Sequence, residues 1–444
     1  MRLRNQAISV GVMHAATVLQ PLLVLPYAGR VLGPHDFGVY AYAMTIEQFI
    51  VTVVGYGFHW TAQRAAASAR SEPAVLSALL AEVSAAGCLL LVLVTVVGLA
   101  VAGPVLPITK SLYMCLLLGG VGAIAFPAWL FIGIERPWQA TIPVVASRLI
   151  ALVCFVTLVR SPAQLNLAVA IQSSVPFVCG VMCLPFLYWM GLSGFRSLTF
   201  GRIKHQLVDG WRGFQFTLAE RVSMILPVPL VEHIAGYAAA GQFSVAEKFV
   251  TATRIGFRAV VDTLLPRVAY YAAHDPAKGI SLIRRSFLTL VGGVMISVAM
   301  FFIAPPLIIL FFGSQFSPAI SIVRSMAILP LILNANTCLS TLYMLNYGHE
   351  RAWALLAAAG LLCLISVSYM GSVYIGNPTM AVVLGMIAKE ILILVVAATF
   401  FLRFSQGKAK SYSHHDMTSP LHRLRRLSVT QALPDQIQSD HHVV

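Results

Sequence analysis

The 444-residue chain is 58% hydrophobic and only 10% charged, with a mean hydropathy of +0.83 and a formal net charge of +14. A soluble domain carries roughly a quarter charged residues, so this composition excludes an ordinary soluble protein. Most of the surface must therefore face lipid, where only helices or closed barrels satisfy all of their backbone polar groups.

The length of the apolar runs distinguishes helices from barrel strands. The runs are continuous over about 20 residues, whereas strands of a membrane barrel alternate in polarity over about 10 residues. We therefore predict an all-α membrane protein with about twelve transmembrane helices. The predicted spans are 8–31, 37–58, 76–102, 112–133, 140–160, 165–190, 208–231, 241–266, 287–312, 317–346, 353–375 and 379–403.

Lysine and arginine are distributed unevenly between alternate loops. With the N-terminus in the cytoplasm, 20 of the 30 basic residues lie on the cytoplasmic side, three lie opposite and seven lie within spans. Because cytoplasmic loops are enriched in Lys and Arg, we predict that both termini are cytoplasmic. The positive net charge then reflects membrane topology, and we predict no nucleic-acid partner.

The last 40 residues, 405–444, differ from the rest because they are polar and contain a basic cluster at 423–426. Such a segment buries too little apolar area to order itself, so we expect a disordered cytoplasmic tail. Binding to the membrane surface is the alternative role for its basic residues.

The seven cysteines all fall inside apolar runs, where small residues pack helices together. Cys179 and Cys183 share a helix face, but two thiols without a nearby His or carboxylate do not make a metal site. We therefore expect no metal.

Two motifs occur twice. The pattern Gly, four residues, Gly, one residue, aromatic stands at 33–40 and again at 236–243, an offset of 203 residues. The pattern Gly-x-Glu-Arg-x-Trp stands at 133–138 and again at 348–353, an offset of 215 residues. Each pair occupies equivalent points of two halves with six predicted spans, which indicates duplication.

An even number of spans gives both copies the same orientation in the membrane. The repeats are then parallel, related by an axis along the membrane normal. We expect two six-helix lobes, residues 1–200 and 201–404, around a central cavity.

Three segments resemble the polysaccharide-transporter, or Wzx-type flippase, family of the multidrug/oligosaccharidyl-lipid/polysaccharide exporter superfamily. Residues 26–40, with the sequence PYAGRVLGP followed by FGVY, resemble the first hairpin of the family. Residues 241–267 are similar to its eighth span, and residues 313–351 resemble its tenth. The resemblance covers residues 1 to about 404 of the chain.

The resemblance implies a transporter without catalytic residues or a cofactor. Its cargo would be polyprenyl-diphosphate-linked oligosaccharide, moved from the cytoplasmic to the outer leaflet of a bacterial inner membrane. The product would be O-antigen, capsule or exopolysaccharide. Membrane lipids, and a polysaccharide polymerase and chain-length proteins, are the other partners that it implies.

Two sister branches of the superfamily fit less well. Multidrug exporters typically carry a carboxylate in the first span, and lipid II flippases carry arginines in their first two spans. This chain has only Arg30, at the end of the first span. The polar residues of that span are Ser9, His14, Thr17 and Gln20. A drug or small-molecule exporter remains the alternative.

A membrane-bound glycosyltransferase or polymerase is the third class of function that we considered. Such enzymes need carboxylates or histidines in sizeable loops where donor and acceptor meet. The longest predicted loops, near 59–75, 191–207 and 267–286, are basic and contain no acid pair. The sequence therefore argues against an enzyme.

The predicted eighth span carries an unusual set of polar residues at helical spacing. Its members fall within roughly an 80° arc at ~100° per residue. They are Glu247, Thr251, Arg254, Arg258 and Asp262. Arg254 lies about 20 Å along the helix from Gly241, near the membrane midplane. A central arginine costs at least ~2.5–3.5 kcal/mol, so it must face protein or water and usually marks a transport pathway.

Arginine pairs bidentately with phosphate oxygens, so Arg254 and Arg258 are predicted to clamp a diphosphate. The alternative is a structural network in which Arg258 is neutralised by Asp262. The other candidates for the substrate cavity are Lys248, Thr251, Arg221, Arg148 and Arg324. In the adjacent pairs Glu220-Arg221 and Lys389-Glu390 the side chains point about 100° apart, so we expect pairing across helices.

The chain contains no Gly-x4-Gly-Lys-Ser/Thr phosphate loop, which argues against ATP as its energy source. The glycines within 119–122 lie inside an apolar run, where close helix packing is expected. The hypothesis is alternating access coupled to H⁺ or Na⁺ through a buried carboxylate. The candidate carboxylates are Glu220, Glu247, Asp262 and Glu390.

Overall fold

The computed structural model describes residues 2–192 and 199–407; within these ranges some side chains, including those of 258 and 262, are not described. The described chain is almost entirely helical and contains no named strand, which confirms the predicted all-α class. Its α-helices are α1 (Arg2–Gly55), α2 (Phe58–Ser68), α3 (Pro73–Val101), α4 (Lys110–Ala125), α5 (Ala128–Gly133), α6 (Trp138–Leu158), α7 (Leu165–Trp189), α8 (Phe200–Ile225), α9 (Pro227–His274), α10 (Pro276–Ser286), α11 (Thr289–Phe312), α12 (Ala319–Met326), α13 (Leu329–Thr337), α14 (Glu350–Tyr374) and α15 (Pro378–Gly407). Shorter elements are η1 (Pro162–Gln164), η2 (Ser314–Phe316) and the π-helix η3 (Cys338–Met344).

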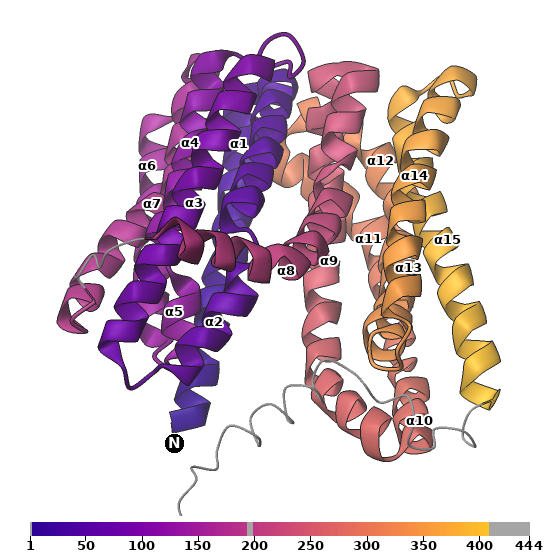
Figure 1. Cartoon of the computed structure of the whole chain (residues 1–444). Helices are drawn as coiled ribbons and strands as arrows, with labels where there is room; N and C mark the ends of the chain where they lie inside the picture. The colour runs from indigo at the N-terminus through magenta and orange to yellow at the C-terminus, as the bar shows by residue number, and fades with distance from the viewer. Residues whose placement is uncertain (1, 193–198, 408–444) are drawn as a thin grey trace, which may run out of the picture.

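Two bundles of helices stand side by side (Figure 1). The N-terminal bundle comprises α1 to α7, and the C-terminal bundle comprises α9 to α15, with α1 and α9 in contact where the bundles meet. The N-terminus, α10 and the end of α15 lie at the same end of the molecule. Because α8 contacts helices of both bundles, the lobe boundary at residue 200 remains a prediction.

Ten stretches of the described chain are long and apolar enough to cross a membrane. Two of these stretches are divided by a glycine with non-helical backbone angles: Gly33 at φ 73°, ψ 171° and Gly236 at φ 81°, ψ 174°. Residues with a Cβ essentially do not adopt these angles, so the glycines allow the chain to turn back. Each divided stretch can therefore cross twice, which gives about twelve crossings, as hydropathy predicts.

Beyond the two glycine turns, α1 and α9 cross closely. A methyl group added to Gly38 would collide with the carbonyl oxygen of Tyr237, and one added to Gly241 would collide with the carbonyl oxygen of Pro34. The two contacts are equivalent, because 34 and 38 correspond to 237 and 241 at the repeat offset of 203. The first repeated motif thus forms a pseudo-symmetric contact between the two bundles.

The two copies of the second repeated motif differ more in their structure. In the first copy the residue with positive φ is Glu135 at 60°, whereas in the second it is Gly348 at 78°. Gly133 packs against the backbone of Gln63 on α2, while a methyl group on Gly348 would meet no atom within 4 Å. Both motifs therefore form turns, but only the first has the same packing in both halves.

The structure differs from the predicted spans around α8. The sequence predicts a seventh span at 208–231, whereas α8 ends at Ile225 and runs crosswise from the N-terminal bundle to α9 (Figure 1). Ile203 and Leu207 pack against the N-terminal bundle, while the exposed residues of α8 are both charged and apolar: Arg202, Lys204, Asp209, Phe200, Val208 and Trp211. The apolar stretch Gly213–Arg254 includes the second half of α8, so this half and the start of α9 together form the segment that can cross before Gly236.

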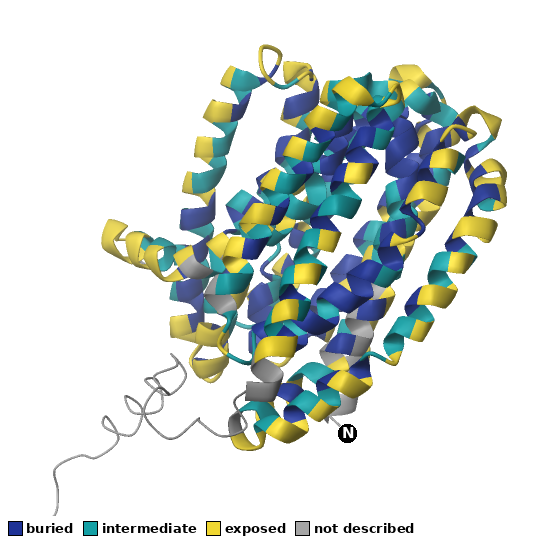
Figure 2. Ribbon diagram, turned by 90° about the vertical axis from the view of Figure 1, so that its right-hand side faces the viewer, coloured by how far each residue is buried: buried dark blue, intermediate teal, exposed yellow. Residues whose placement is uncertain are grey.

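The outer surface of both bundles is apolar, and the buried residues lie between the helices (Figure 2). The exposed large side chains include Leu93, Val96, Met295, Phe302, Leu355 and Val373. Lipid is the solvent that such a surface requires. The glycines within 119–122 pack as expected: Gly120 meets Ile50 and Leu91, and Gly122 meets the α7 backbone at Pro176.

Candidate functional site

A cavity of about 550 Å³ lies between the two bundles. Both walls carry polar and charged side chains, although the outer surface of the same helices is apolar. The charged and amide side chains in its lining are Glu47, Gln48, Arg148, Gln172, Arg221, Glu247, Lys248, Arg254, Lys389 and Glu390.

On the C-terminal side of the cavity, α9 contributes a small network around Glu247. Its carboxylate accepts hydrogen bonds from Lys248 Nζ at 2.8 Å and from Thr251 Oγ1 at 2.7 Å. Because Thr251 stands one helical turn after Glu247, both side chains lie on the face that borders the cavity. Glu247 is thus held by one cation and one hydroxyl.

A second network joins α9, α13 and α15 around Glu390. Asn336 Nδ2 donates to the Glu390 carboxylate at 2.7 Å, and Lys389 Nζ lies 3.2 Å from it. Arg254 is farther away, with 3.8 Å between its Nη2 and the carboxylate. Lys389 and Glu390 also pair with each other, which was not expected, because the long lysine side chain folds back onto its neighbour; Glu390 pairs across helices with Arg254, as expected.

On the N-terminal side, the amides of Gln20 on α1 and Gln172 on α7 exchange hydrogen bonds of 3.1 and 3.2 Å. Arg148 on α6 donates through Nη1 to Gln20 Oε1 at 3.2 Å. Its Nε is buried and has no hydrogen-bond partner in the described part of the chain. Arg148 therefore presents a free donor beside the cavity, where a buried unpaired donor is costly unless water or a ligand binds it.

Glu47 supplies the carboxylate of this wall. A methyl group on Gly119 would collide with the Glu47 side chain, so the absence of a side chain there lets Glu47 lie against α4. The lining then holds five basic and three acidic side chains, Glu47, Glu247 and Glu390 being the acids. With all of them ionised, the cavity has an excess of positive charge and attracts anions.

The structure brings together most of the site residues predicted from the sequence. Seven of them line the cavity: Arg148, Arg221, Glu247, Lys248, Thr251, Arg254 and Glu390. Glu220 lies on α8 outside the lining, and Arg324 on α12 is exposed, with its guanidinium carbon 5.4 Å from the centre of the Phe301 ring. The side chains of Arg258 and Asp262 lie outside the described residues.

Sequence reasoning missed the amide half of the site. Gln20 appears in the sequence as one polar residue among several in the first span, with nothing to connect it to Gln172 or Arg148. Asn336 sits in the helix just before the π-helix η3, an irregularity that is frequent at functional sites. A polar residue in the middle of each apolar run is the signal that could have found them.

The two bundles are joined at the end opposite the N-terminus. Gln315 on η2 donates to the carbonyl oxygen of Gly29 at 3.1 Å, and the Arg30 guanidinium donates to the carbonyl oxygen of Leu310. The side chain of Tyr237 reaches back to the carbonyl oxygen of Pro107. These hydrogen bonds between the two bundles lie beside the Gly38–Gly241 crossing. This set of contacts closes one end of the cavity.

Comparison with known proteins places the chain in a family. The family described as "Polysaccharide biosynthesis protein" matches residues 3–272. The chain belongs to this family. It is 26% identical over 374 residues to a provisionally named O-antigen transporter of Escherichia coli (strain K12), covering 83% of this chain and 89% of that protein. A similarly named protein of Shigella dysenteriae is 25% identical, with 76% and 85% of the two chains covered.

Solved structures of transporters share the fold of this polysaccharide biosynthesis family member. An inward-facing multidrug resistance MATE family transporter of the MOP superfamily aligns with a TM-score of 0.71 at 13% identity, covering 89% of this chain and 96% of that one. An outward-facing conformation of such a transporter gives a TM-score of 0.59, with 92% and 96% covered. The fold of these multi-pass membrane proteins is thereby confirmed for the described part of the chain.

Proposed function

We propose that this chain is a flippase that moves polyprenyl-diphosphate-linked oligosaccharide from the cytoplasmic to the outer leaflet of a bacterial inner membrane. The observation that carries the proposal is the cavity between the bundles, where five basic side chains gather inside a protein with an apolar outer surface. The names of the relatives, which are O-antigen transporters, support the class of cargo.

A polar cavity removes the main barrier to flipping. Each sugar hydroxyl that enters hydrocarbon without a hydrogen-bond partner costs ~2–7 kcal/mol, so an oligosaccharide alone faces tens of kcal/mol. Amides and charged groups in the cavity replace the lost water while the polyprenyl tail stays in the bilayer. No covalent bond of the cargo changes, so the proposal describes a transporter and needs no catalytic group.

The diphosphate would bind between the bundles. Arg148 on the N-terminal side has a free Nε, and Arg254 on the C-terminal side is only loosely paired, at 3.8 Å from Glu390. Arginine binds phosphate oxygens through two parallel hydrogen bonds, which makes both groups suitable partners. A phosphate held by one arginine from each bundle would couple cargo binding to the relative position of the bundles.

The same charges supply a route for ion coupling. A phosphate that pairs with Lys248 and Arg254 competes with the carboxylates of Glu247 and Glu390 for these cations. A carboxylate that loses its cation in a buried site then favours uptake of H⁺ or Na⁺. Binding of the cargo and uptake of the coupling ion would thereby favour one another in the same cavity.

The closed end of the cavity is the end that alternating access would open. The bundles touch through Gly38 and Gly241, so separating them there would open the cavity to the side opposite the N-terminus. The higher TM-score to the inward-facing transporter supports assigning the present state as closed on that side. The excess of Lys and Arg in the loops on the N-terminal side supports assigning that side to the cytoplasm.

The test is the leaflet sidedness of lipid-linked oligosaccharide in cells depleted of the protein and complemented with variants. Arg254→Gln and Arg148→Gln should each slow exposure of the saccharide to an impermeant glycosidase by about tenfold or more, because a hydrogen bond to a charged group contributes about 1.5–3 kcal/mol. Arg324→Gln is the matched control, since it removes a guanidinium that does not line the cavity. It should leave the rate within about twofold.

An unchanged rate in depleted cells that lack a redundant flippase would overturn the assignment. A drug or small-molecule exporter would then take its place, a reading favoured by the multidrug transporters among the structural neighbours. Efflux of cationic dyes that depends on Glu247 and Glu390 would identify that function. If Arg324→Gln also slowed exposure of the saccharide to the glycosidase, the effect of the substitutions on transport would arise outside the cavity.

A further inference from the structure

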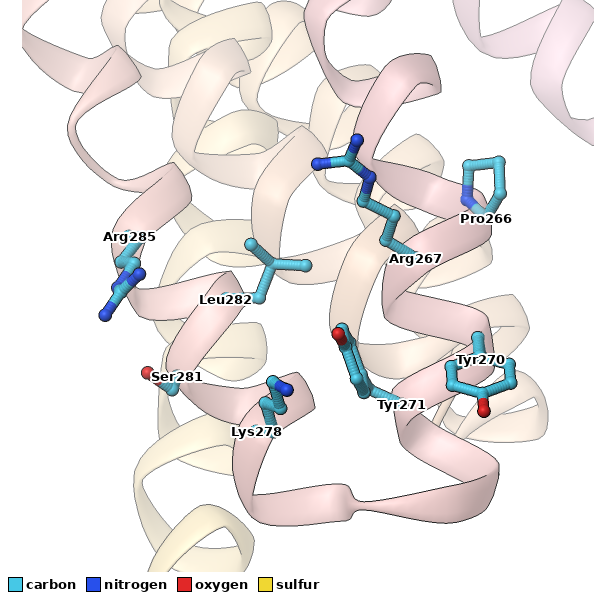
Figure 3. A pocket seen from close by; sticks show the side chains of 8 residues that line it. All are labelled: Pro266, Arg267, Tyr270, Tyr271, Lys278, Ser281, Leu282 and Arg285. Carbon is cyan, nitrogen blue, oxygen red and sulfur yellow. The ribbon is translucent and has the colours of Figure 1, made fainter.

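A second pocket lies away from the central cavity. It is at the end of the C-terminal bundle that lies at the same end of the molecule as the N-terminus of the chain. It has a volume of about 500 Å³ and lies between the last turns of α9 and the short helix α10 (Figure 3). Its lining residues are Pro266, Arg267, Tyr270, Tyr271, Lys278, Ser281, Leu282 and Arg285. Arg267 follows Arg254 by 13 residues of α9, so the pocket lies about 20 Å along the helix from the cavity arginine.

The pocket is basic and its cations are available. Arg267, Lys278 and Arg285 are exposed, and no carboxylate forms an ion pair with them among the described residues. Asp275, the acid between Arg267 and Lys278 in the chain, is engaged as the helix cap of α10, where its carboxylate accepts from the Lys278 backbone N–H at 3.1 Å. Lys278 Nζ lies 4.7 Å from the centre of the Tyr271 ring. Figure 3 shows Arg267 and Tyr271 reaching from α9 toward α10.

Helix α10, which forms one wall of the pocket, is held in place by Tyr347. The Tyr347 hydroxyl donates to the carbonyl oxygen of Pro276 at 3.1 Å, and a methyl group on Gly279 would collide with it. Burial raises the pKa of Tyr347 to about 12, so the hydroxyl stays neutral and keeps donating at physiological pH. Gly279 and Ile283 are buried, whereas Lys278 and Arg285 are exposed, so α10 presents its charges on one face.

The location of the pocket indicates its ligand. α10 joins the long helix α9 to the apolar helix α11 at the end of the bundle, where a bilayer surface would lie (Figure 1). Tyrosines are typical of this interfacial depth, and clustered Lys and Arg beside a membrane helix bind anionic headgroups. We propose that the pocket binds the phosphate of a lipid headgroup at the membrane surface, through Arg267, Lys278 and Arg285.

Two lipids could supply this phosphate: an anionic phospholipid of the surrounding leaflet, or the diphosphate of a polyprenyl lipid before it enters the cavity. The inference does not rest on the proposed function, because binding can be measured without transport. The experiment is native mass spectrometry of the purified full-length protein with phosphatidylglycerol, phosphatidylcholine or a polyprenyl diphosphate added.

The test variant is the triple substitution Arg267→Gln, Lys278→Gln and Arg285→Gln. Each basic residue near an anionic surface strengthens binding about fivefold, so the triple should weaken binding of the phosphate lipid about 100-fold. The matched control is Arg64→Gln, Lys204→Gln and Arg284→Gln, which removes three exposed charges outside the pocket. It should change binding by less than about threefold.

The charge-preserving triple Arg267→Lys, Lys278→Arg and Arg285→Lys keeps the test valid if the glutamine variant folds poorly, because it should retain binding. If the glutamine variant loses binding of phosphatidylglycerol but keeps binding of the polyprenyl diphosphate, the pocket is assigned to bulk lipid. If the glutamine variant loses binding of the polyprenyl diphosphate but keeps binding of phosphatidylglycerol, the pocket is assigned to the cargo lipid. Equal binding of both lipids by the glutamine variant and the control triple overturns the inference.

Discussion

Glu390 stands at the centre of the most heavily charged part of the cavity. It is only 9% exposed and faces Lys389, also 9% exposed, and Arg254. Removing one partner of a buried ion pair leaves an uncompensated charge, whereas removing both partners avoids that cost. The network therefore depends on the Glu390 carboxylate, and in the proposed mechanism a bound phosphate would take its place as the partner of a cation.

This balance predicts the effect of single and double substitutions on stability. Glu390→Gln should lower the free energy of unfolding by about 3–5 kcal/mol, because Lys389 and Arg254 lose their carboxylate. The double variant Lys389→Met, Glu390→Gln should recover a large part of the loss. Thermal unfolding of the purified protein in one detergent measures both. Equal losses in the single and double variants would show that the Lys389 charge does not depend on Glu390.

The part of the site that could be predicted is the part that lies on one helix. Glu247, Thr251 and Arg254 recur at helical spacing, so their common face can be read from the sequence alone. The contact of Arg254 with Glu390 joins residues 136 positions apart, and no periodicity encodes it. Arg324, predicted for the cavity, and Glu220, predicted as a coupling carboxylate, do not line the cavity, because a charge in an apolar run does not reveal which face of its helix meets the other bundle.

Among the structural elements, the crossing of α1 and α9 is the closest contact between the bundles. Gly38 and Gly241 allow the two backbones to touch, and the side chains of Tyr42 and Tyr237 pack across the contact with ring centres 5.8 Å apart. Any Cβ at either glycine would push the helices apart. The crossing thus depends on two residues that the repeated motif places in equivalent positions.

Gly38→Ala or Gly241→Ala should open this end of the molecule. Overpacking costs about 1–3 kcal/mol, so the closed arrangement should become about tenfold or more less populated. In a background without native cysteines, a cysteine at position 42 should then react faster with an impermeant maleimide. Gly256→Ala is the control on α9, since a methyl group there would meet no atom within 4 Å. Equal labelling rates in all three variants would contradict a role for the crossing.

The helical elements themselves were largely predictable, because length and hydropathy suffice to find a membrane span. The turns at Gly33 and Gly236 were also marked by the repeated motif. The crosswise α8 was not predicted, because its second half is apolar and the hydropathy of 208–231 resembles that of a span.

For the whole molecule, the distribution of contacts between the bundles defines how it can move. Hydrogen bonds from Arg30, Tyr237 and Gln315 join the bundles beside the glycine crossing, and the central cavity lies toward the other end. Opening this end must break these contacts and separate His35 from Tyr237, whose rings pack with centres 5.7 Å apart. A transport cycle that visits both sides of the membrane therefore requires these two residues to part.

A covalent link across this contact should stop the cycle. With the native cysteines replaced, His35→Cys and Tyr237→Cys joined by a short bifunctional thiol reagent should abolish exposure of lipid-linked oligosaccharide, and a reductant that cleaves the link should restore it. The pair Thr109→Cys and Ser111→Cys is the control, because their hydroxyls lie 3.0 Å apart within one bundle and a link there spans no moving contact. If the linked His35–Tyr237 variant transports at the rate of its reduced form, the two bundles do not separate here. The cargo would then have to leave by a path that keeps this end closed.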